Sequence, residues 1–432
     1  MRWSGGLRGY GRGFGKSARA ARAWDRNMKP SRAAIRNWLA TLPERSREHI
    51  DWAVRRIADA KQRGGKVVVV TGSGPNIHEG VTTLLAEWIR KGLVDGVVTS
   101  SAVVAHEMAG TLDYVKRVPI TSSGQFGVDP RILPRGGVFE ATVLNDEQRR
   151  VLEGWIAEGW DRYDRLMSAP GRVILKAAGN MAWPVGWWTE ALARQAEQLA
   201  RQTGSTVERI AGLGADQRTM LGAGARAGVP VLVSVPQLVG GGEVGLAVAD
   251  AIPITRRCEL IAQLLGSADV IIESALALAQ EIHDGPFELY TGHGIWSAWR
   301  QRFTYSLEKK TLIRIDLDPN LEAAWLQERQ NAQVQAAVDR GLPKTKLTGM
   351  PFRMEMSGFA RLEGSIPITG DIGIVWPVLA AGLEDALGLD FDFISAPQET
   401  EEGKRMREWI AREVAFVNRD AMQEAAQLAP LG

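Results

Sequence analysis

Short apolar runs alternate with helical stretches from residue 66 onwards, and this alternation most constrains the fold. Runs such as VVVV at 67–70, VPVLVSV at 229–235 and DVIIE at 269–273 are each followed by a turn or glycine-rich loop and then a helical stretch. Continuous apolar strands separated by helices are typical of a parallel sheet that helices cover on both faces. We therefore predict an α/β fold with a doubly wound, mostly parallel sheet of six or seven strands.

The same patterns divide the chain into four segments. The predicted strands lie at 66–70, 94–100, 171–179, 229–236, 268–274 and 311–319, with a further strand after residue 364. Apolar residues spaced three and four apart predict helices before the first strand and after the last. The expected segments are a basic flexible arm at 1–30, a helical segment at 31–65, a single α/β domain at 66–395 and a C-terminal helix at 396–432.

Charge and composition narrow the possible partners and location. The formal net charge is +2, so no overall basic field predicts a nucleic-acid partner. No apolar run reaches 18 residues, which argues against a membrane span. Cys258 is the single cysteine and fits a reducing compartment, so we expect a cytoplasmic protein. The basic arm is either a targeting or anion-binding element or a flexible extension.

The turn GSGPNIHEG at 72–80 follows the first strand, where parallel sheets bind ligands. Glycines there let backbone amides approach a phosphate, and a helix N-terminus adds a positive dipole. The turn is neither a G-x-G-x-x-G fingerprint nor a Walker loop. Both a ligand-binding loop and a plain strand-to-helix turn remain open. In the first case Gly72, Ser73, Gly74 and Asn76 are candidate cofactor-binding residues.

Polar residues also follow other predicted strands. Thr99, Ser100 and Ser101 come directly after the second strand, and the glycine-rich loop LVGGGEVG at 238–245 lies near the same edge. Asp316 ends the run TLIRID and Asp318 follows two residues later, at a strand end where a carboxylate commonly accepts hydrogen bonds from ribose hydroxyls. Asp318, before Pro319, can equally cap a helix.

A resemblance to a known superfamily adds to these patterns. The segment from Gly74-Pro75 through His78, and then Ser101-Ala102 with His106-Glu107, resembles the domain shared by archaeal ornithine cyclodeaminase and LOR/SDH-related proteins. TLIRIDLDPN resembles the same family's strand and turn. The chain is thus similar to the deoxyhypusine-synthase-like NAD-binding superfamily, which implies a Rossmann-type sheet with NAD as cofactor.

The middle and end of the chain are similar to deoxyhypusine synthase itself. ILKAAGNMAWP at 174–184 follows its Gly-Asn order, and ITGDIGIVWP at 368–377 resembles its last strand, which points to Asp371 as a cofactor-binding residue. Members of the superfamily assemble as dimers and tetramers, so the resemblance implies a homodimer or homotetramer.

Two departures from that pattern affect the chemistry. The family's lysine nucleophile has no counterpart in SGFARLEGSIPITGD at 357–371, and Lys344 or Lys346 could replace it or belong to a solvated turn. Ser101 stands where the cyclodeaminase family has Asn. Because the lysine nucleophile is missing, we do not expect deoxyhypusine synthesis.

The resemblance implies hydride loss from an amine-bearing carbon, an imine and return of the hydride, which requires a base and a carboxylate. His78 is the first base candidate, and His106 with Glu107 the second. Glu273, at the end of an apolar strand, or Glu243 could hold the amine. The remaining candidates for the amine site are His283, His293, Trp296 and Trp299, which could equally form a subunit interface. No histidine pair has i, i+4 spacing, so we expect no metal site.

Three functions follow. The first is an NAD-dependent enzyme acting on a cationic amino acid or polyamine-like amine through an imine. The second is an aminoalkyl transferase of the deoxyhypusine or homospermidine synthase type with a displaced lysine. The third is an NAD-binding assembly or sensor protein without catalysis.

Overall fold

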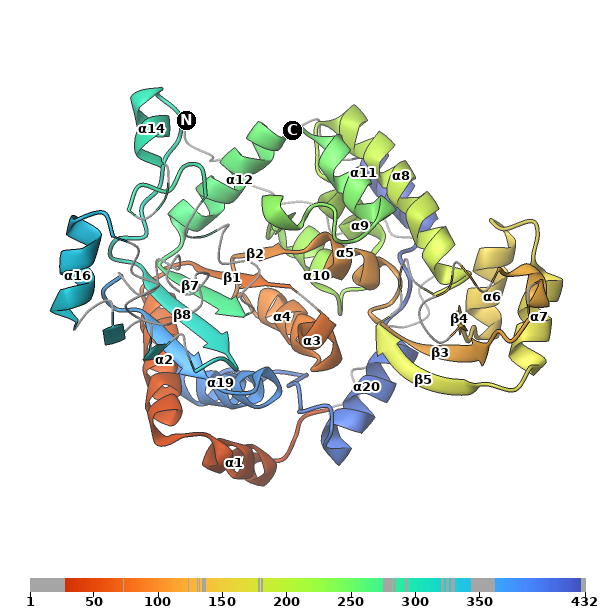
Figure 1. The fold of residues 1–432 in the computed structure, drawn as a ribbon, viewed down its shortest axis with the longest axis horizontal. Coiled ribbons are helices and arrows are strands. Elements are labelled where there is room, and N and C mark those ends of the chain that lie inside the picture. The colour runs from red at the N-terminus through yellow and green to blue at the C-terminus, as the bar shows by residue number, and fades with distance from the viewer. Residues whose placement is uncertain are drawn as a thin grey trace.

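A computed structural model gives the fold of residues 28–428 (Figure 1). The positions within that range that it does not describe are 73, 123, 130, 132, 134–136, 178, 180–181, 275–281, 283–284, 291, 293, 320–321, 324–325, 328–330 and 343–361. Ser73, His283, His293, Lys344, Lys346 and nearly all of the basic arm therefore lie outside the described residues.

Six parallel strands form the main sheet, in the spatial order β6-β2-β1-β7-β8-β9. Their bounds are β1 Val67–Thr71, β2 Gly96–Thr99, β6 Val231–Val233, β7 Val270–Ser274, β8 Thr311–Asp316 and β9 Ile366–Thr369. The predicted α/β fold with a doubly wound parallel sheet is confirmed. Within the described residues no helix has both the length and the apolar content to cross a bilayer.

The helices of the described residues precede, connect and follow these strands. They are α1 Arg32–Thr41, α2 Glu44–Gln62, α3 Gly74–His78, α4 Val81–Arg90, α5 Ser101–Met108, α6 Asp146–Glu153, α7 Trp160–Ser168, α8 Val185–Thr203, α9 Val207–Gly214, α10 Met220–Ala227, α11 Glu243–Ala251, α12 Ile254–Ser267, α14 Gly294–Trp299, α16 Ala332–Asp339, α19 Ile372–Leu387, α20 Glu401–Glu413 and α21 Arg419–Leu428.

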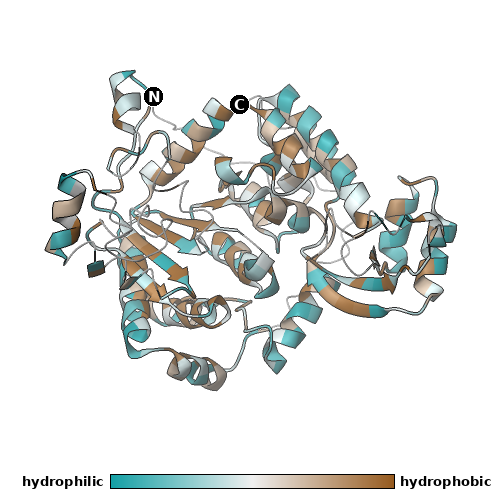
Figure 2. Cartoon of the chain, viewed as in Figure 1, coloured by the Kyte–Doolittle hydropathy of each residue, from teal (hydrophilic) through white to brown (hydrophobic). Residues whose placement is uncertain are grey.

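Both faces of the main sheet are buried, which explains why its strands are continuously apolar. Val67 and Val69 pack into a core that includes residues of α2, α4 and α19. Val68 and Val70 point the other way, into a second core with residues of α12. Successive side chains of a strand alternate between faces, so a strand covered on both sides needs apolar residues at every position. Figure 2 shows these strands as hydrophobic, between helices with hydrophilic outer surfaces.

The strand order changes direction at β1. The chain passes from β1 through α3 and α4 to β2 on one side, whereas β7, reached through α12, lies on the other side of β1. The carboxyl ends of β1 and β7 therefore form the topological switch point, which is where open parallel sheets bind ligands.

A second sheet has the order β4-β3-β5 and is antiparallel, with β3 Leu112–Pro119, β4 Val138–Thr142 and β5 Arg172–Ala177. It lies with α6 and α7 beside the main body (Figure 1). The prediction that 171–179 belongs to the parallel sheet is wrong, because β5 pairs with β3. β5 is mostly exposed or half-buried, whereas β1 is buried throughout.

The C-terminal region contains two helices, α20 and α21, where the sequence predicts one. Between them, backbone N–H groups donate to the main body instead of to the preceding helical turn. Val417 donates to the Met108 carbonyl and Asn418 to the Gly214 carbonyl, at 3.0 and 2.8 Å. These bonds end the helical path and fix the C-terminal region against α5 and α9.

Candidate functional site

A hydrogen-bond network joins β1, β7 and two helices at the switch point. The side-chain amide of Asn76, in α3, donates to the carbonyl of Gly72 at 2.5 Å and to that of Ser274 at 3.3 Å. The Ser274 hydroxyl donates to Asn76 Oδ1 at 2.9 Å and accepts from Trp376 Nε1 at 3.2 Å. Gly72 and Asn76, predicted to bind the cofactor, are thus part of the frame that fixes the turn after β1. Gly74 begins α3 and is exposed.

Hydroxyl groups line the carboxyl edge beside this network. Thr71 lies opposite Ser274, and Thr99 ends β2 next to Thr71, because Val70 and Val98 are register partners. The hydroxyl oxygens of Thr71, Thr99 and Ser234 are buried and have no hydrogen-bond partner among the described residues. Buried hydroxyls without a partner are rare and costly, so these oxygens fit the polar atoms of a bound molecule or water.

Ser100 and Ser101 make hydrogen bonds within the protein. Ser100 caps α5 by accepting from the Val103 amide at 3.2 Å. The Ser101 hydroxyl donates to the Gln237 carbonyl at 2.8 Å and accepts from the Gly241 amide at 2.9 Å. A Cβ at Gly241 would lie 2.6 Å from the Ser101 carbonyl oxygen, so the close packing of this loop requires glycine. The glycine-rich loop therefore packs on α5 at the same edge.

His78 and His106 lie in one cluster at the junction of the two sheets. His78 ends α3, His106 lies in α5, and β5 and α20 bring Lys176 and Arg407 to them. Arg407 Nη2 lies 3.2 Å from His78 Nδ1 and donates to the Leu175 carbonyl at 2.6 Å. We call His78, His106, Lys176 and Arg407 the His-cation cluster.

Charge balance in the His-cation cluster favours neutral histidines. Burial lowers the pKa of His78, and the charges of Arg407 and Lys176 lower it further. Burial lowers the pKa of His106 to about 4, with smaller effects from His78 and Lys176. Lys176 Nζ donates to Glu140 Oε2 at 2.6 Å, so one carboxylate offsets part of the positive charge. At neutral pH each ring then has one N–H donor and one acceptor nitrogen.

A glycine with unusual backbone geometry brings the chain close to His106. Gly179 follows β5 with φ +105°, and a Cβ there would lie 3.0 Å from His106 Nδ1. That nitrogen is buried and has no hydrogen-bond partner among the described residues. Gly179 therefore covers one nitrogen of the ring.

Two of the predicted acidic residues make structural contacts away from the His-cation cluster. Glu107 accepts from the amides of Met220 and Leu221 at 2.9 and 3.0 Å, which caps α10. Burial raises the pKa of Glu107 to about 7. Asp371 caps α19 by accepting from the Gly373 amide at 2.8 Å. The catalytic and cofactor roles assigned to these two residues stay predictions.

Glu273 and the strand-end aspartates lie on β7 and β8. Glu273 forms a fully buried ion pair with Arg314, at 3.2 Å, and Arg314 Nη2 lies 3.8 Å from Asp316. Asp316 also accepts from the Asp318 amide at 3.0 Å, as in an Asx turn. These carboxylates line the β7–β8 side of the switch point, separate from the two histidines.

The remaining candidates are dispersed. Glu243 forms an ion pair with Arg194 at the start of α11. Trp296 and Trp299 lie in α14 and are 69% and 83% exposed, so they are not part of the lining of the His-cation cluster. Within the described part of the chain, no three His, Cys, Asp or Glu side chains are placed to hold a metal ion.

The structure adds four residues that sequence reasoning missed. In the sequence Lys176 is marked only by its position inside an apolar run. No motif around Glu140 or Arg407 predicts a functional site. Glu79, next to His78, accepts from the Gln398 amide and side chain at 2.8 and 2.7 Å. Burial, with the charge of Asp371, raises the pKa of Glu79 to about 7.

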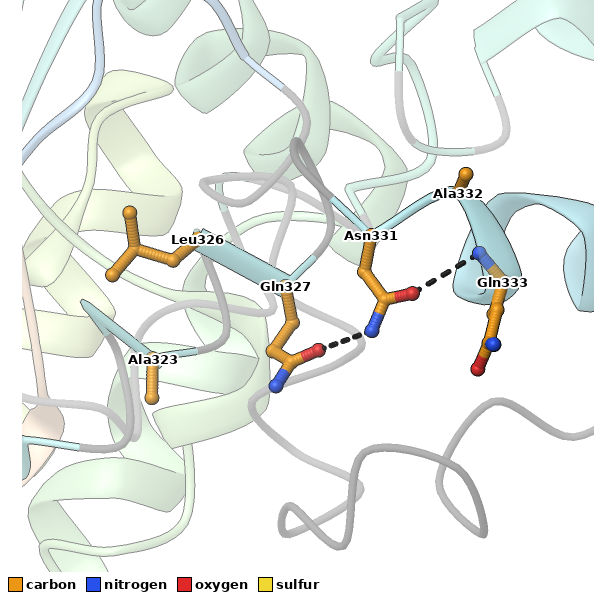
Figure 3. A pocket seen from close by; sticks show the side chains of 6 residues that line it. All are labelled: Ala323, Leu326, Gln327, Asn331, Ala332 and Gln333. Atoms are coloured by element: carbon orange, nitrogen blue, oxygen red, sulfur yellow. Dashed lines mark hydrogen bonds between the residues drawn. The ribbon is translucent and has the colours of Figure 1, made fainter.

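A hollow of about 520 Å³ is lined by the segment that follows β8 in the chain and by the start of α16 (Figure 3). Its described lining residues are Ala323, Leu326, Gln327, Asn331, Ala332 and Gln333. None of these described side chains titrates, so the described part of the lining offers no acid, base or charged anchor. None of the predicted site residues is among the described lining residues.

Comparisons with known proteins give fold-level similarity only. No protein-family model matches the chain, and no curated protein matches it. A putative LOR/SDH protein from Methanococcus maripaludis S2 is 11% identical over 80% of this chain and 71% of its own, with a TM-score of 0.39. AgrE, in a ternary complex with ornithine and NAD+, is 14% identical over 80% of this chain and 34% of its own, with a TM-score of 0.37.

A third similar structure is ArgZ, an arginine dihydrolase from the ornithine-ammonia cycle in cyanobacteria. It is 11% identical over 80% of this chain and 32% of its own, with a TM-score of 0.36. The chain thus spans about a third of the length of AgrE and ArgZ. Because these TM-scores lie below 0.5, the activities of the three proteins are not evidence for this chain. The LOR/SDH side of the resemblance has a counterpart among these structures, and the deoxyhypusine-synthase side has none among them.

Proposed function

We propose that the chain is an NAD-dependent enzyme that acts on an amino acid through hydride transfer and an imine intermediate. The observation that carries this proposal is the His-cation cluster, which puts two neutral histidines beside two cations. It lies where α3 and α5 leave the carboxyl edge of the sheet. A neutral imidazole accepts or donates a proton near neutral pH, as this reaction requires.

The carboxyl edge fits the cofactor. Thr71, Thr99 and Ser234 offer buried hydroxyls without partners, at the edge where such sheets bind dinucleotides. Asp316 ends β8 and is a candidate for the ribose hydroxyls, as the sequence predicts. NAD, when bound, supplies hydride acceptance and return. The protein's own groups hold the two molecules, exclude water and move protons.

The charges of the His-cation cluster favour an amino acid over a polyamine. Arg407 and Lys176 attract an anionic group, and a substrate carboxylate supplies one. A polyamine carries only cations, which these two side chains repel. The amine end of an amino acid must lose one proton before hydride can leave its carbon, and a neutral histidine can take that proton. Hydride loss then leaves an iminium carbon.

The test starts from a matched pair of substrates. NAD affinity is measured by calorimetry, and the chain with NAD is then mixed with lysine or ornithine and with cadaverine or putrescine, the same molecules without the carboxylate. We expect transient absorbance of reduced nicotinamide and a new product with the amino acids only. Lack of NAD binding, or equal turnover of the diamines, would contradict the proposal.

Hydroxyl variants locate the cofactor site. Thr99→Val removes a buried hydroxyl at the carboxyl edge while keeping the side-chain shape, and it should weaken NAD binding about five-fold or more. Thr142→Val removes a similarly buried hydroxyl from β4 in the second sheet and should leave NAD affinity unchanged. Equal effects of the two variants would place the cofactor elsewhere.

Lys176 supports a second candidate, aminoalkyl transfer with a lysine nucleophile. Its charge acts on both histidines, and its Nζ forms an ion pair with Glu140. Borohydride trapping with substrate would add mass at Lys176 if the lysine forms an imine. Lys176→Arg separates the two functions, because arginine keeps the charge but cannot be the nucleophile.

A further inference from the structure

We infer that Arg407 is a positioning residue that fixes His78 as the Nε2–H tautomer, which makes His78 a hydrogen-bond donor and leaves His106 as the proton acceptor of the pair. The role assignment rests on the proposed function. The tautomer assignment does not, because it follows from one contact within the protein.

The first step is the contact itself. Arg407 Nη2 lies 3.2 Å from His78 Nδ1 and 2.6 Å from the Leu175 carbonyl oxygen. Guanidinium groups have only donors, and Nη2 carries two hydrogens. One hydrogen serves Leu175 and the other points to His78, so Nδ1 must accept. A neutral imidazole that accepts at Nδ1 carries its proton at Nε2.

The second step is that His78 stays neutral. Burial lowers the pKa of His78 most, and the charges of Arg407 from α20 and Lys176 from β5 lower it further. His106 from α5 is the other titratable group that interacts with it. Protonation of His78 would place the second proton of the ring on Nδ1, the nitrogen that faces Arg407. That would break the hydrogen bond and set two cations against each other.

The third step separates the roles of the two histidines. The acceptor nitrogen of His78 is engaged by Arg407, so His78 offers a ligand only a donor. His106 makes no side-chain hydrogen bond among the described residues, and Gly179 packs against its Nδ1. Because Gly179 covers Nδ1, the His106 nitrogen assigned to accept a substrate proton is Nε2. This assignment of donor and acceptor differs from the sequence prediction, in which His78 is the first candidate for the base.

The tautomer is measured without any substrate. The chain has five histidines, so selective ¹⁵N-histidine labelling and long-range ¹H–¹⁵N spectra give five ring systems, which His→Gln variants assign. We expect an unprotonated Nδ1 and a protonated Nε2 for His78 in the full chain with no mutation. A protonated Nδ1 would overturn the inference, and this outcome does not depend on whether NAD binds.

Variants of α20 test the cause. Arg407→Ala should release His78 into a mixture of tautomers and raise its pKa, because a nearby cation is removed. Arg405→Ala, on the same helix with a 63% exposed side chain, is the matched control and should change neither. A His78 spectrum unchanged by Arg407→Ala in a folded chain would overturn the role of Arg407.

Matched glutamine variants test the roles. Glutamine can replace a hydrogen-bond donor but cannot accept a proton and titrate. His78→Gln should therefore keep at least a tenth of kcat, whereas His106→Gln should lose a hundred-fold or more at unchanged NAD affinity. The reverse order would overturn the assignment. Loss of NAD binding in the unmutated chain would instead contradict the proposed function, and the two failures are distinguishable.

Discussion

Ser274 and Asn76 join the two strands on either side of the switch point: the Ser274 hydroxyl, at the end of β7, donates to Asn76 Oδ1, just beyond β1, at 2.9 Å. Ser274→Ala removes this bond and the acceptor that Trp376 uses. We expect a loss of about 1–3 kcal/mol in the free energy of unfolding, because buried polar atoms lose their partners. Urea titration measures this loss. Ser267→Ala at the end of α12 is the control, and equal losses would argue against a special role of the network.

Glu107→Gln tests whether a predicted catalytic residue acts through structure. The two carboxylate oxygens accept from the first amides of α10, and glutamine keeps only one acceptor. We expect a loss of stability of about 1–2 kcal/mol with turnover largely retained. The measurements are thermal unfolding and activity of the folded fraction. A stable but inactive Glu107→Gln variant would instead support a catalytic role for Glu107.

Gly179→Ala tests the contact that covers His106. Alanine at φ +105° is strained, and its Cβ would lie 3.0 Å from His106 Nδ1. We expect about 2–3 kcal/mol of destabilisation and a changed His106 ring spectrum. Gly204→Ala is a matched control with φ +63° and no heavy atom within 4 Å of the added Cβ. It should cost only about 1 kcal/mol, since backbone strain acts alone there.

His106 should make stability depend on pH. Its folded pKa of about 4 lies below the unfolded value of 6.5, so the unfolded chain binds more protons between these values. Stability is therefore full above pH 6.5 and falls by roughly 3 kcal/mol as the pH drops toward 4. Glu79 and Glu107, with raised pKa values, act in the opposite direction between pH 4.5 and 7. The difference between the unmutated chain and His106→Gln at each pH isolates the histidine, and parallel curves would contradict its lowered pKa.

The main sheet could be predicted from sequence because its signal is local. Four consecutive valines at 67–70 fit only a strand buried on both faces, and the structure places them there. β3 escaped prediction because Asp113, Lys116 and Arg117 interrupt its apolar residues. An antiparallel strand with half-buried positions tolerates such residues, and no continuous run marks it.

The candidate site is harder to predict from sequence than the sheet, because its residues come from distant parts of the chain. The His78 segment stood out because it follows a strand, whereas Arg407 lies in a helix whose charged residues look like a solvated surface. These two residues are 329 positions apart in the chain, and tertiary packing alone brings them together. The sequence predicts that Ser100, Ser101 and Asp371 contact a ligand. In the structure, Ser100 and Asp371 cap helices and Ser101 bonds to a loop.

The position of Arg407 in α20 has a consequence for the order in which the His-cation cluster is assembled during synthesis. All six strands of the parallel sheet and the other three members of the His-cation cluster are translated before α20. Chains fold from the N-terminus as they leave the ribosome. A nascent chain can thus pair the whole sheet while His78 still lacks its guanidinium partner, so the arrangement of the two histidines is completed only when α20 has docked.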